Sequence, residues 1–244
     1  MRVLIVILAM FVGAFLKGVT GSGLPVIAIP VMASFVGVEE AVVIMTIPGV
    51  VTNTWLIWRH RKFRSATRDL PALLVTGVVG VAVGSWLLRS VDNRVLSLAL
   101  AGVIVAYAVT LFVNPHFRLS PAVTRVASPP VGLAAGTLQG ATGISGPLLA
   151  TYLHAFRLPP GAYVLSITTV FQVFALTQVA SLAALGLYTA RRLALSLLAL
   201  VPTMAALPLG ARVASRVPPR VFDAVVLLVL LGSAAKLVVD AVAG

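Results

Sequence analysis

Hydrophobic side chains form long stretches along this chain, and short polar or basic clusters separate them. Apolar runs of about 18 residues or more have the length of helices that cross a membrane. Backbone groups in hydrocarbon must bond internally, and the runs lack the alternation typical of barrel strands. The pattern therefore predicts an all-α polytopic membrane protein. Its expected elements are a broken helix at 3–37, helices at 41–59, 71–89 and 94–113, a second broken helix at 123–156, and helices at 160–186, 192–214 and 219–242.

Two segments of the chain share one pattern of glycine, threonine and proline. The sequence GVTGSGLP at 18–25 returns as GATGISGP at 140–147, an offset of 122 positions. A second match joins GSWLLRSVDNR at 84–94 to GARVASRVPPR at 210–220. Matches at both ends of the unit indicate an internal duplication. We expect two homologous four-element repeats, residues 1–113 and 123–244, joined by a loop at 114–122.

Each repeat begins with a helix that glycine and serine interrupt and that proline starts again. A continuous helix over 3–37 would be about 52 Å long, well beyond the ~30 Å hydrocarbon core. The two parts can cross in tandem, which gives parallel repeats, or form a re-entrant hairpin, which gives inverted repeats. We favour the inverted hairpin, because it keeps the basic turn at 212–220 in the cytoplasm and matches the common use of inverted repeats.

Composition supports the membrane assignment and removes several other classes of function. Only 10% of the 244 residues are charged, against roughly a quarter in a soluble domain. The net charge of +12 comes from arginine and lysine between the apolar runs, as the positive-inside rule requires, so we expect the lipid bilayer and no nucleic acid as partner. There is no cysteine, and the carboxylates fall in loops or near span ends, so no metal or cofactor is expected. A homodimer is compatible with this pattern.

The two breaks carry the candidate chemistry. The first amides of a helix have no helical partner and carry the positive end of the helix dipole, so a helix start with nearby hydroxyls and glycines is suited to an anion. Packing of small residues between helices is the alternative, which we prefer for Gly77, Gly80 and Gly84. The candidate substrate-binding residues at the breaks are Lys17, Thr20, Gly21, Ser22, Gly23, Gln139, Thr142, Gly143, Ser145 and Gly146.

Lys17 is a lone cation inside an apolar run and beside a break, and its repeat mate is Gln139. A lysine within a membrane segment is costly and is therefore a functional candidate, unless it snorkels to an interface. Polar residues of the neighbouring helices could complete the cavity wall or could bond helix to helix. From these helices we select Asn53 and Gln172 as further substrate-binding candidates.

The segment Gly143-Ile144-Ser145-Gly146 has the Gly-x-Ser-Gly form of rhomboid intramembrane proteases. Such a serine needs a histidine base from a later helix, and the last histidine, His154, follows by only nine positions. We therefore do not expect an enzyme.

These motifs resemble the sulfite exporter TauE/SafE family of bacterial membrane permeases. The resemblance covers nearly the whole chain and rests on the glycines before Pro25, the basic loop from Arg59, the glycine-rich helix from Gly77 and the second break at 140–147. It implies a multi-pass protein of the bacterial inner membrane that transports sulfite, sulfoacetate or a related small anion. An anion channel or exchanger without sulfur preference, and a non-transporting membrane scaffold, are the alternatives. The order of glycine and serine differs in the second copy, so the two half-sites are expected to be unequal.

Overall fold

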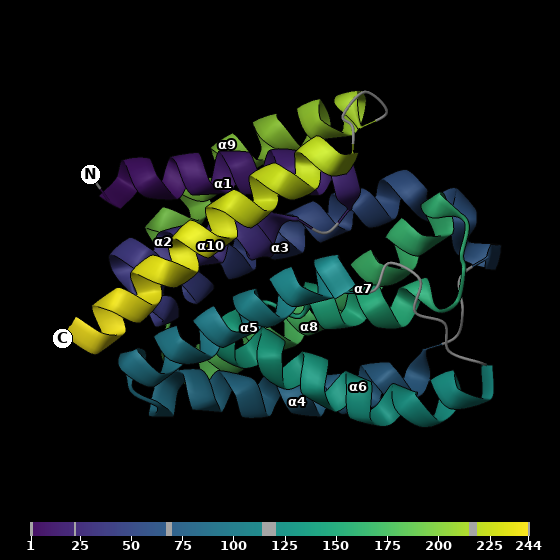
Figure 1. The fold of residues 1–244 in the computed structure, drawn as a ribbon, viewed down its shortest axis with the longest axis horizontal. Helices are drawn as coiled ribbons and strands as arrows, with labels where there is room; N and C mark the ends of the chain where they lie inside the picture. The colour runs from purple at the N-terminus through teal and green to yellow at the C-terminus, as the bar shows by residue number, and fades with distance from the viewer. Residues whose placement is uncertain (1, 22, 67–69, 114–120, 215–218, 244) are drawn as a thin grey trace.

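The computed structural model describes residues 2–21, 23–66, 70–113, 121–214 and 219–243, and their regular structure is helical (Figure 1). The elements are α1 (Arg2–Thr20), α2 (Leu24–Val36), α3 (Val38–His60), η1 (Arg61–Ala66), α4 (Pro71–Ser90), α5 (Asn93–Val113), α6 (Pro121–Thr142), α7 (Gly146–His154), α8 (Pro160–Ala184), α9 (Ala190–Val213) and α10 (Pro219–Ala243). The predicted all-helical class is confirmed.

Five of the described helices are long and apolar enough to cross a membrane. These segments are Val3–Thr20, Val38–Arg64, Pro71–Ser90, Pro160–Ala184 and Ala190–Val213. Shorter apolar helices occur at Leu24–Val36 and Asn93–Ala106. The protein is therefore a multi-pass membrane protein.

Both broken helices reverse their direction at the break. Gly13 of α1 packs against Leu24 and Ala28 of α2, and Gly23 packs against Leu16, so α1 and α2 form an antiparallel hairpin. Figure 1 shows the same reversal between α6 and α7. In that view α1 starts at the left, where both ends of the chain lie, whereas α6 starts at the right.

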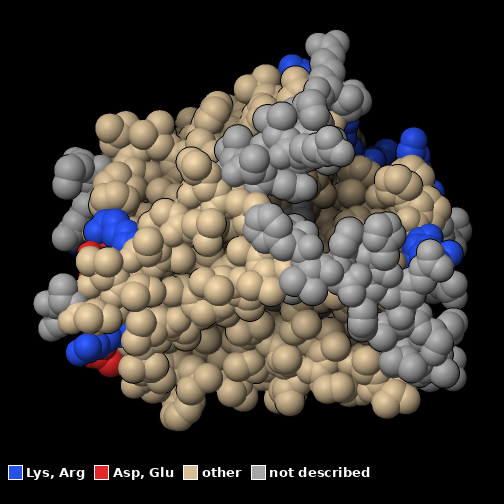
Figure 2. Space-filling view, viewed as in Figure 1, with Lys and Arg blue, Asp and Glu red and all other residues tan. Residues whose placement is uncertain are grey.

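The two ends of the bundle differ in charge (Figure 2). Phe63 of η1 packs against Gly161 at the start of α8, so these segments share the right-hand end of Figure 1. That end carries Arg59, Arg61, Lys62, Arg64 and Arg157. At the opposite end, Asn93 bonds the backbone of Val38. That end carries Glu39, Glu40, Asp92 and Asp240 together with Arg89, Arg94, Arg191 and Arg192.

Glycine faces bring two pairs of helices into backbone contact. A Cβ at Gly84 of α4 would lie 2.8 Å from the amide of Ala141 and 2.9 Å from the Cα of Gly140 in α6. A Cβ at Gly18 of α1 would lie 2.8 Å from the amide of Ala211 and 3.0 Å from the Cα of Gly210 in α9. Real Cβ atoms essentially never approach so closely. The prediction that the α4 glycines serve packing is confirmed.

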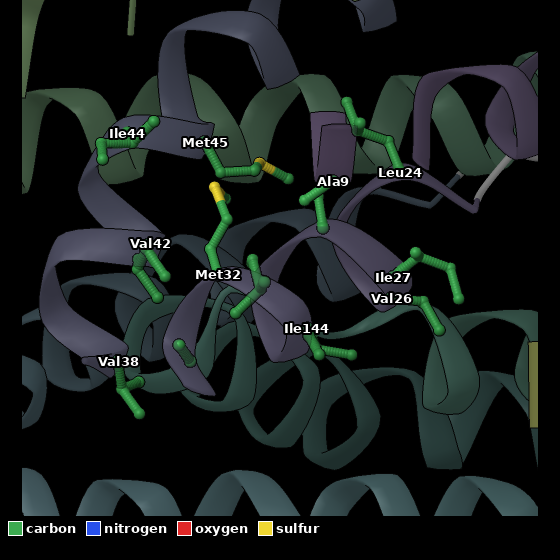
Figure 3. Packing of buried hydrophobic residues seen from close by; sticks show 14 of the residues in the cluster. Ala9, Leu24, Val26, Ile27, Met32, Val38, Val42, Ile44, Met45 and Ile144 are labelled. Atoms are coloured by element: carbon green, nitrogen blue, oxygen red, sulfur yellow. The ribbon is translucent and has the colours of Figure 1, made fainter. Parts of the chain in front are cut away.

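Side chains of the two breaks meet inside the main hydrophobic cluster. Figure 3 shows Ile144, from the second break, near Val26, which follows the first break in α2, with Met32 further along α2 and Met45 on α3. Ile144 is 2% exposed, and the cluster extends over α1, α2, α3 and α9. The two breaks therefore lie side by side in the interior, although 122 positions separate their sequences.

The glycine contacts predict the effect of a single methyl group. Gly136→Ala in α6 would place a Cβ 2.9 Å from the amide of Val81, with the carbonyl of Gly77 closer still. Overpacking of this kind costs about 1–3 kcal/mol, which exceeds the gain in helix propensity of up to about 1 kcal/mol. We expect a lower melting temperature in detergent and a smaller monodisperse fraction on size-exclusion chromatography.

Gly102→Ala in α5 is the matched control, because a Cβ there would meet nothing within 4 Å. It should leave the melting temperature unchanged or raise it slightly. Equal losses in both variants would contradict the packing explanation.

Candidate functional site

The helices before the two breaks end in the same way. Gly21 has φ +85° and Gly143 has φ +72°, a left-handed conformation that glycine adopts without strain. The Gly21 amide donates to the carbonyl of Lys17 (2.7 Å), and the Gly143 amide donates to the carbonyl of Gln139 (2.8 Å). The same type of backbone cap therefore occurs in both halves. It involves the carbonyl of Lys17 in the first half and that of Gln139 in the second, each four positions before its glycine.

The helices after the breaks also start alike. Gly23 precedes α2 and Ser145 precedes α7, and each helix has a proline in its first turn. Neither start has a side-chain cap. Leu24 and Gly146, the first residues of these helices, are buried, so both positive helix ends lie in the interior.

Lys17 is buried against α3. Its side chain is 2% exposed, and its Nζ donates to Thr52 Oγ1 (2.9 Å) and to Asn53 Oδ1. The Thr52 hydroxyl itself donates to the carbonyl of Pro48 (2.8 Å). The burial excludes the snorkelling alternative. The ion pairs of the described residues join other partners, so Lys17 has no carboxylate partner among them.

Gln139 occupies the corresponding place in α6 and bonds to α8. Its Nε2 donates to Gln178 Oε1 (3.0 Å), and its Oε1 accepts from Ser145 Oγ (2.8 Å). Gln178 Nε2 donates to the backbone carbonyls of Gln139 (2.8 Å) and Gly140 (3.3 Å). Hydrogen bonds within the protein therefore engage both amide groups.

A small cavity of about 20 Å³ lies between these two polar groups. Its lining is Lys17, Pro25, Met45, Thr46, Gly49, Asn53, Gln139, Phe171, Ala175 and Gln178. A volume of this size holds about one water molecule. Lys17, Asn53 and Gln139 are the sequence-predicted residues that the structure brings together here.

The other described candidates at the breaks do not line this cavity. The Thr20 hydroxyl donates to the Leu16 carbonyl (3.0 Å), and the Thr142 hydroxyl donates to the Leu138 carbonyl (2.8 Å), so both bond their own helix. Ser145 is fully buried and reaches the cavity only through Gln139.

The glycines of the breaks allow close packing between helices. Gly21 faces Val164 of α8, Gly143 faces Ile29 of α2, and Gly146 lies near Val26. Gly23 packs inside its own hairpin. Ser22 lies outside the described residues.

Gln172 lies apart from the cavity. Its Nε2 donates to Thr54 Oγ1 (3.2 Å), which joins α8 to α3. Gln178, six residues further along the helix, reaches the cavity instead. The sequence carried a signal for it, because Thr177 and Gln178 lie 125 positions after Thr52 and Asn53, close to the offset between the two breaks.

Tyr188 is a second residue that the sequence did not reveal. It lies in the turn between α8 and α9, and its hydroxyl is 2.7 Å from Thr46 Oγ1 in the cavity wall. Burial raises the pKa of Tyr188 above its usual value, and the hydrogen bond to Thr46 opposes this shift. The tyrosine therefore remains a neutral phenol near neutral pH.

The sequence model of the sulfite exporter TauE/SafE family matches residues 5–237. The chain belongs to this family. No curated protein and no solved structure is significantly similar to it. The TauE/SafE match extends over both broken helices and every residue that lines the cavity. A transporter family of this description fits the apolar helices and the buried polar centre.

The amide network predicts different roles for the two glutamines of α8. Gln178→Ala removes the partner of Gln139 and leaves a buried amide without its acceptor, which costs about 1–3 kcal/mol. We expect a lower melting temperature in detergent together with reduced solute flux in liposomes. Gln172→Ala on the same helix should leave flux near the wild-type value. If Gln172→Ala abolished flux and Gln178→Ala did not, the cavity would be misassigned.

Proposed function

We propose that this protein carries a small sulfur oxyanion, such as sulfite or an organosulfonate, across the membrane through the centre between the two breaks. The observation that supports this most is the buried Lys17, which lines the cavity and has no carboxylate partner among the described residues. An uncompensated ammonium in the interior is costly, and a bound anion removes that cost. The family match supplies the sulfur preference.

The arrangement of the helices supports a mechanism of alternating access. We propose that residues 1–113 and 123–244 are inverted repeats, because α1 and α6 start at opposite ends of the bundle. A cavity of about 20 Å³ cannot hold a tetrahedral oxyanion, so this conformation is closed. Transport then requires the hairpins and the neighbouring helices to separate, first toward one side and then toward the other.

Lys17 provides the direct test of anion transport. Lys17→Gln keeps a polar side chain but removes the charge, so we expect flux of sulfite and methanesulfonate into proteoliposomes to fall by at least about tenfold, a loss of 1.4 kcal/mol. Lys17→Arg retains a cation and should keep part of the activity, although the planar guanidinium fits the site differently.

The same assay separates the alternatives. Wild-type flux of chloride equal to that of sulfite would indicate a channel or exchanger without sulfur preference, and absence of flux with every anion would indicate a scaffold. Variants are compared at equal amounts of folded protein, as judged by size-exclusion chromatography.

We also propose that the basic end of the bundle faces the cytoplasm of a bacterial cell. The cluster on η1 satisfies the positive-inside rule, whereas the opposite end mixes acidic and basic residues. The chain contains no cysteine, so single cysteines report sidedness without a background signal.

Asp92 and Lys62 lie at opposite ends and are both exposed. In intact spheroplasts of the inner membrane, Asp92→Cys should react with an impermeant maleimide and Lys62→Cys should react only after permeabilisation. The reverse pattern would invert the proposed orientation, and labelling of both or neither would refute the placement of these ends on opposite sides.

A further inference from the structure

We infer that the central site takes anions of a single negative charge: bisulfite or a sulfonate, and not the sulfite or sulfate dianion. This inference rests on the proposed function and specifies which charge state the transporter accepts. It follows from the distribution of charge and of hydrogen-bond donors around the cavity.

The charge at the cavity comes from one side chain. Of the described residues that line it, Lys17 is the single ionisable one. The others are neutral: Thr46, Asn53, Gln139 and Gln178 on the polar side, and Pro25, Met45, Gly49, Phe171 and Ala175 on the apolar side. Tyr188 reaches the rim through Thr46, and its hydroxyl is neutral. The positive ends of α2 and α7 contribute about 0.3–2 kcal/mol each, less than a full counter-ion, so one ammonium compensates one negative charge.

The cation at the cavity and an amide NH₂ without a partner among the described residues belong to the first half of the chain. Lys17 uses two of its three N–H groups on Thr52 and Asn53. Asn53 accepts from Lys17 through Oδ1, and its amide NH₂ makes no hydrogen bond to the described residues. Both side chains are at least nine-tenths buried and line the cavity. Lys17 and Asn53 can thus hold one oxyanion together.

The second half offers no second cation. Gln139 donates one N–H of its amide to Gln178, and Gln178 donates to two backbone carbonyls, so at most one neutral N–H, on Gln139, remains there. Breaking these bonds to serve a second negative charge would leave buried carbonyls without donors. The repeat places neutral Gln139 where a second lysine would have made the site symmetric and dicationic.

A dianion in this site would leave one buried negative charge without a partner. The cost of such a charge corresponds to a discrimination of about a hundredfold or more. Methanesulfonate and sulfate test this directly, because both are tetrahedral sulfur oxyanions but carry one and two charges. We expect wild-type proteoliposomes to take up methanesulfonate at least about a hundredfold faster than sulfate.

A change of pH provides a second measurement on the wild-type protein. Bisulfite loses its proton to become the sulfite dianion as pH rises through neutrality, whereas methanesulfonate keeps one charge. Sulfite uptake should therefore fall with rising pH relative to methanesulfonate uptake. The methanesulfonate measurement corrects for titration of the protein itself, Lys17 and Tyr188 included.

Two variants change the side chains at the corresponding positions 17 and 139. Gln139→Lys adds the second cation and should raise the ratio of sulfate to methanesulfonate uptake by about tenfold or more. The exchange variant with Lys17→Gln and Gln139→Lys moves the single cation across the cavity and should keep the preference for the monoanion. Folded yield is measured for each. If either variant fails to fold, the wild-type ratio and its pH dependence decide the question.

The outcomes separate this inference from the proposed function. Wild-type sulfate uptake within about threefold of methanesulfonate uptake, with both lost in Lys17→Gln, would overturn the charge selectivity and leave anion transport standing. Absence of uptake for all sulfur anions would refute the proposed function itself. An unchanged ratio in a folded Gln139→Lys protein would show that charge compensation at this cavity does not set the selectivity, and would overturn the inference.

Discussion

Backbone contact between glycine faces determines where the two breaks can lie. In water the hydrophobic effect drives helices together. In lipid this driving force is absent, so helices associate through close packing, and small residues let their backbones approach closely. Gly84 meets Gly140, and Gly18 meets Gly210, so each broken helix packs tightly on a helix from the other half of the chain. Because each broken helix packs on a helix of the other half, these contacts fix the position of the end of α1 relative to the end of α6 within the bundle. Lys17 and Gln139 face the same cavity as a consequence.

The two breaks share a backbone geometry but differ in chemistry. Gly21 and Gly143 have the same left-handed conformation, and the amide of each donates to the carbonyl four residues earlier. The side chains four positions earlier are a lysine on one side and a glutamine on the other. The glutamine is neutral and bonds to Ser145 and Gln178, whereas the lysine is a cation with one N–H group beyond those on Thr52 and Asn53. In the proposed site, the first half of the chain would therefore bind the anion and the second half would stabilise the cavity.

The sequence predicted the elements well because their determinants are local. The ranges 71–89 and 160–186 differ by only one or two residues from α4 and α8, since proline starts both helices and the apolar run sets their length. Lys17 was found for the same reason: a cation inside an apolar run is visible without a structure. Whether 1–113 and 123–244 are true repeats stays a prediction.

The contacts between helices could not be predicted from the sequence, because they are not determined locally. Gln172 was chosen from a polar stretch of α8. Its position around the helix axis directs it to Thr54, and Gln178 of the same helix lines the cavity instead. The offset between the repeats also drifts from 122 at the breaks to 126 at the glycine turns, so a fixed offset misplaces residues by up to a helical turn. Thr20 and Thr142 have hydroxyls that suit an anion, yet each bonds the carbonyl four residues back, a competition that sequence cannot resolve.

If this conformation is the closed one, as proposed, the contacts around the cavity differ in how readily they can open. The glycine interfaces are dry and tight, and no ligand atom can replace a backbone contact, so α1 with α9 and α4 with α6 are expected to move as rigid pairs. The polar contacts to α3 are different in kind. Asn53 holds Lys17 from this helix, and Tyr188 holds Thr46. In the proposed site an oxyanion binds Lys17 and Asn53 together, and water can take the place of Thr46 at the phenol. Under the proposed mechanism the anion lowers the cost of opening only to the extent that it binds the open conformation more tightly than the closed one.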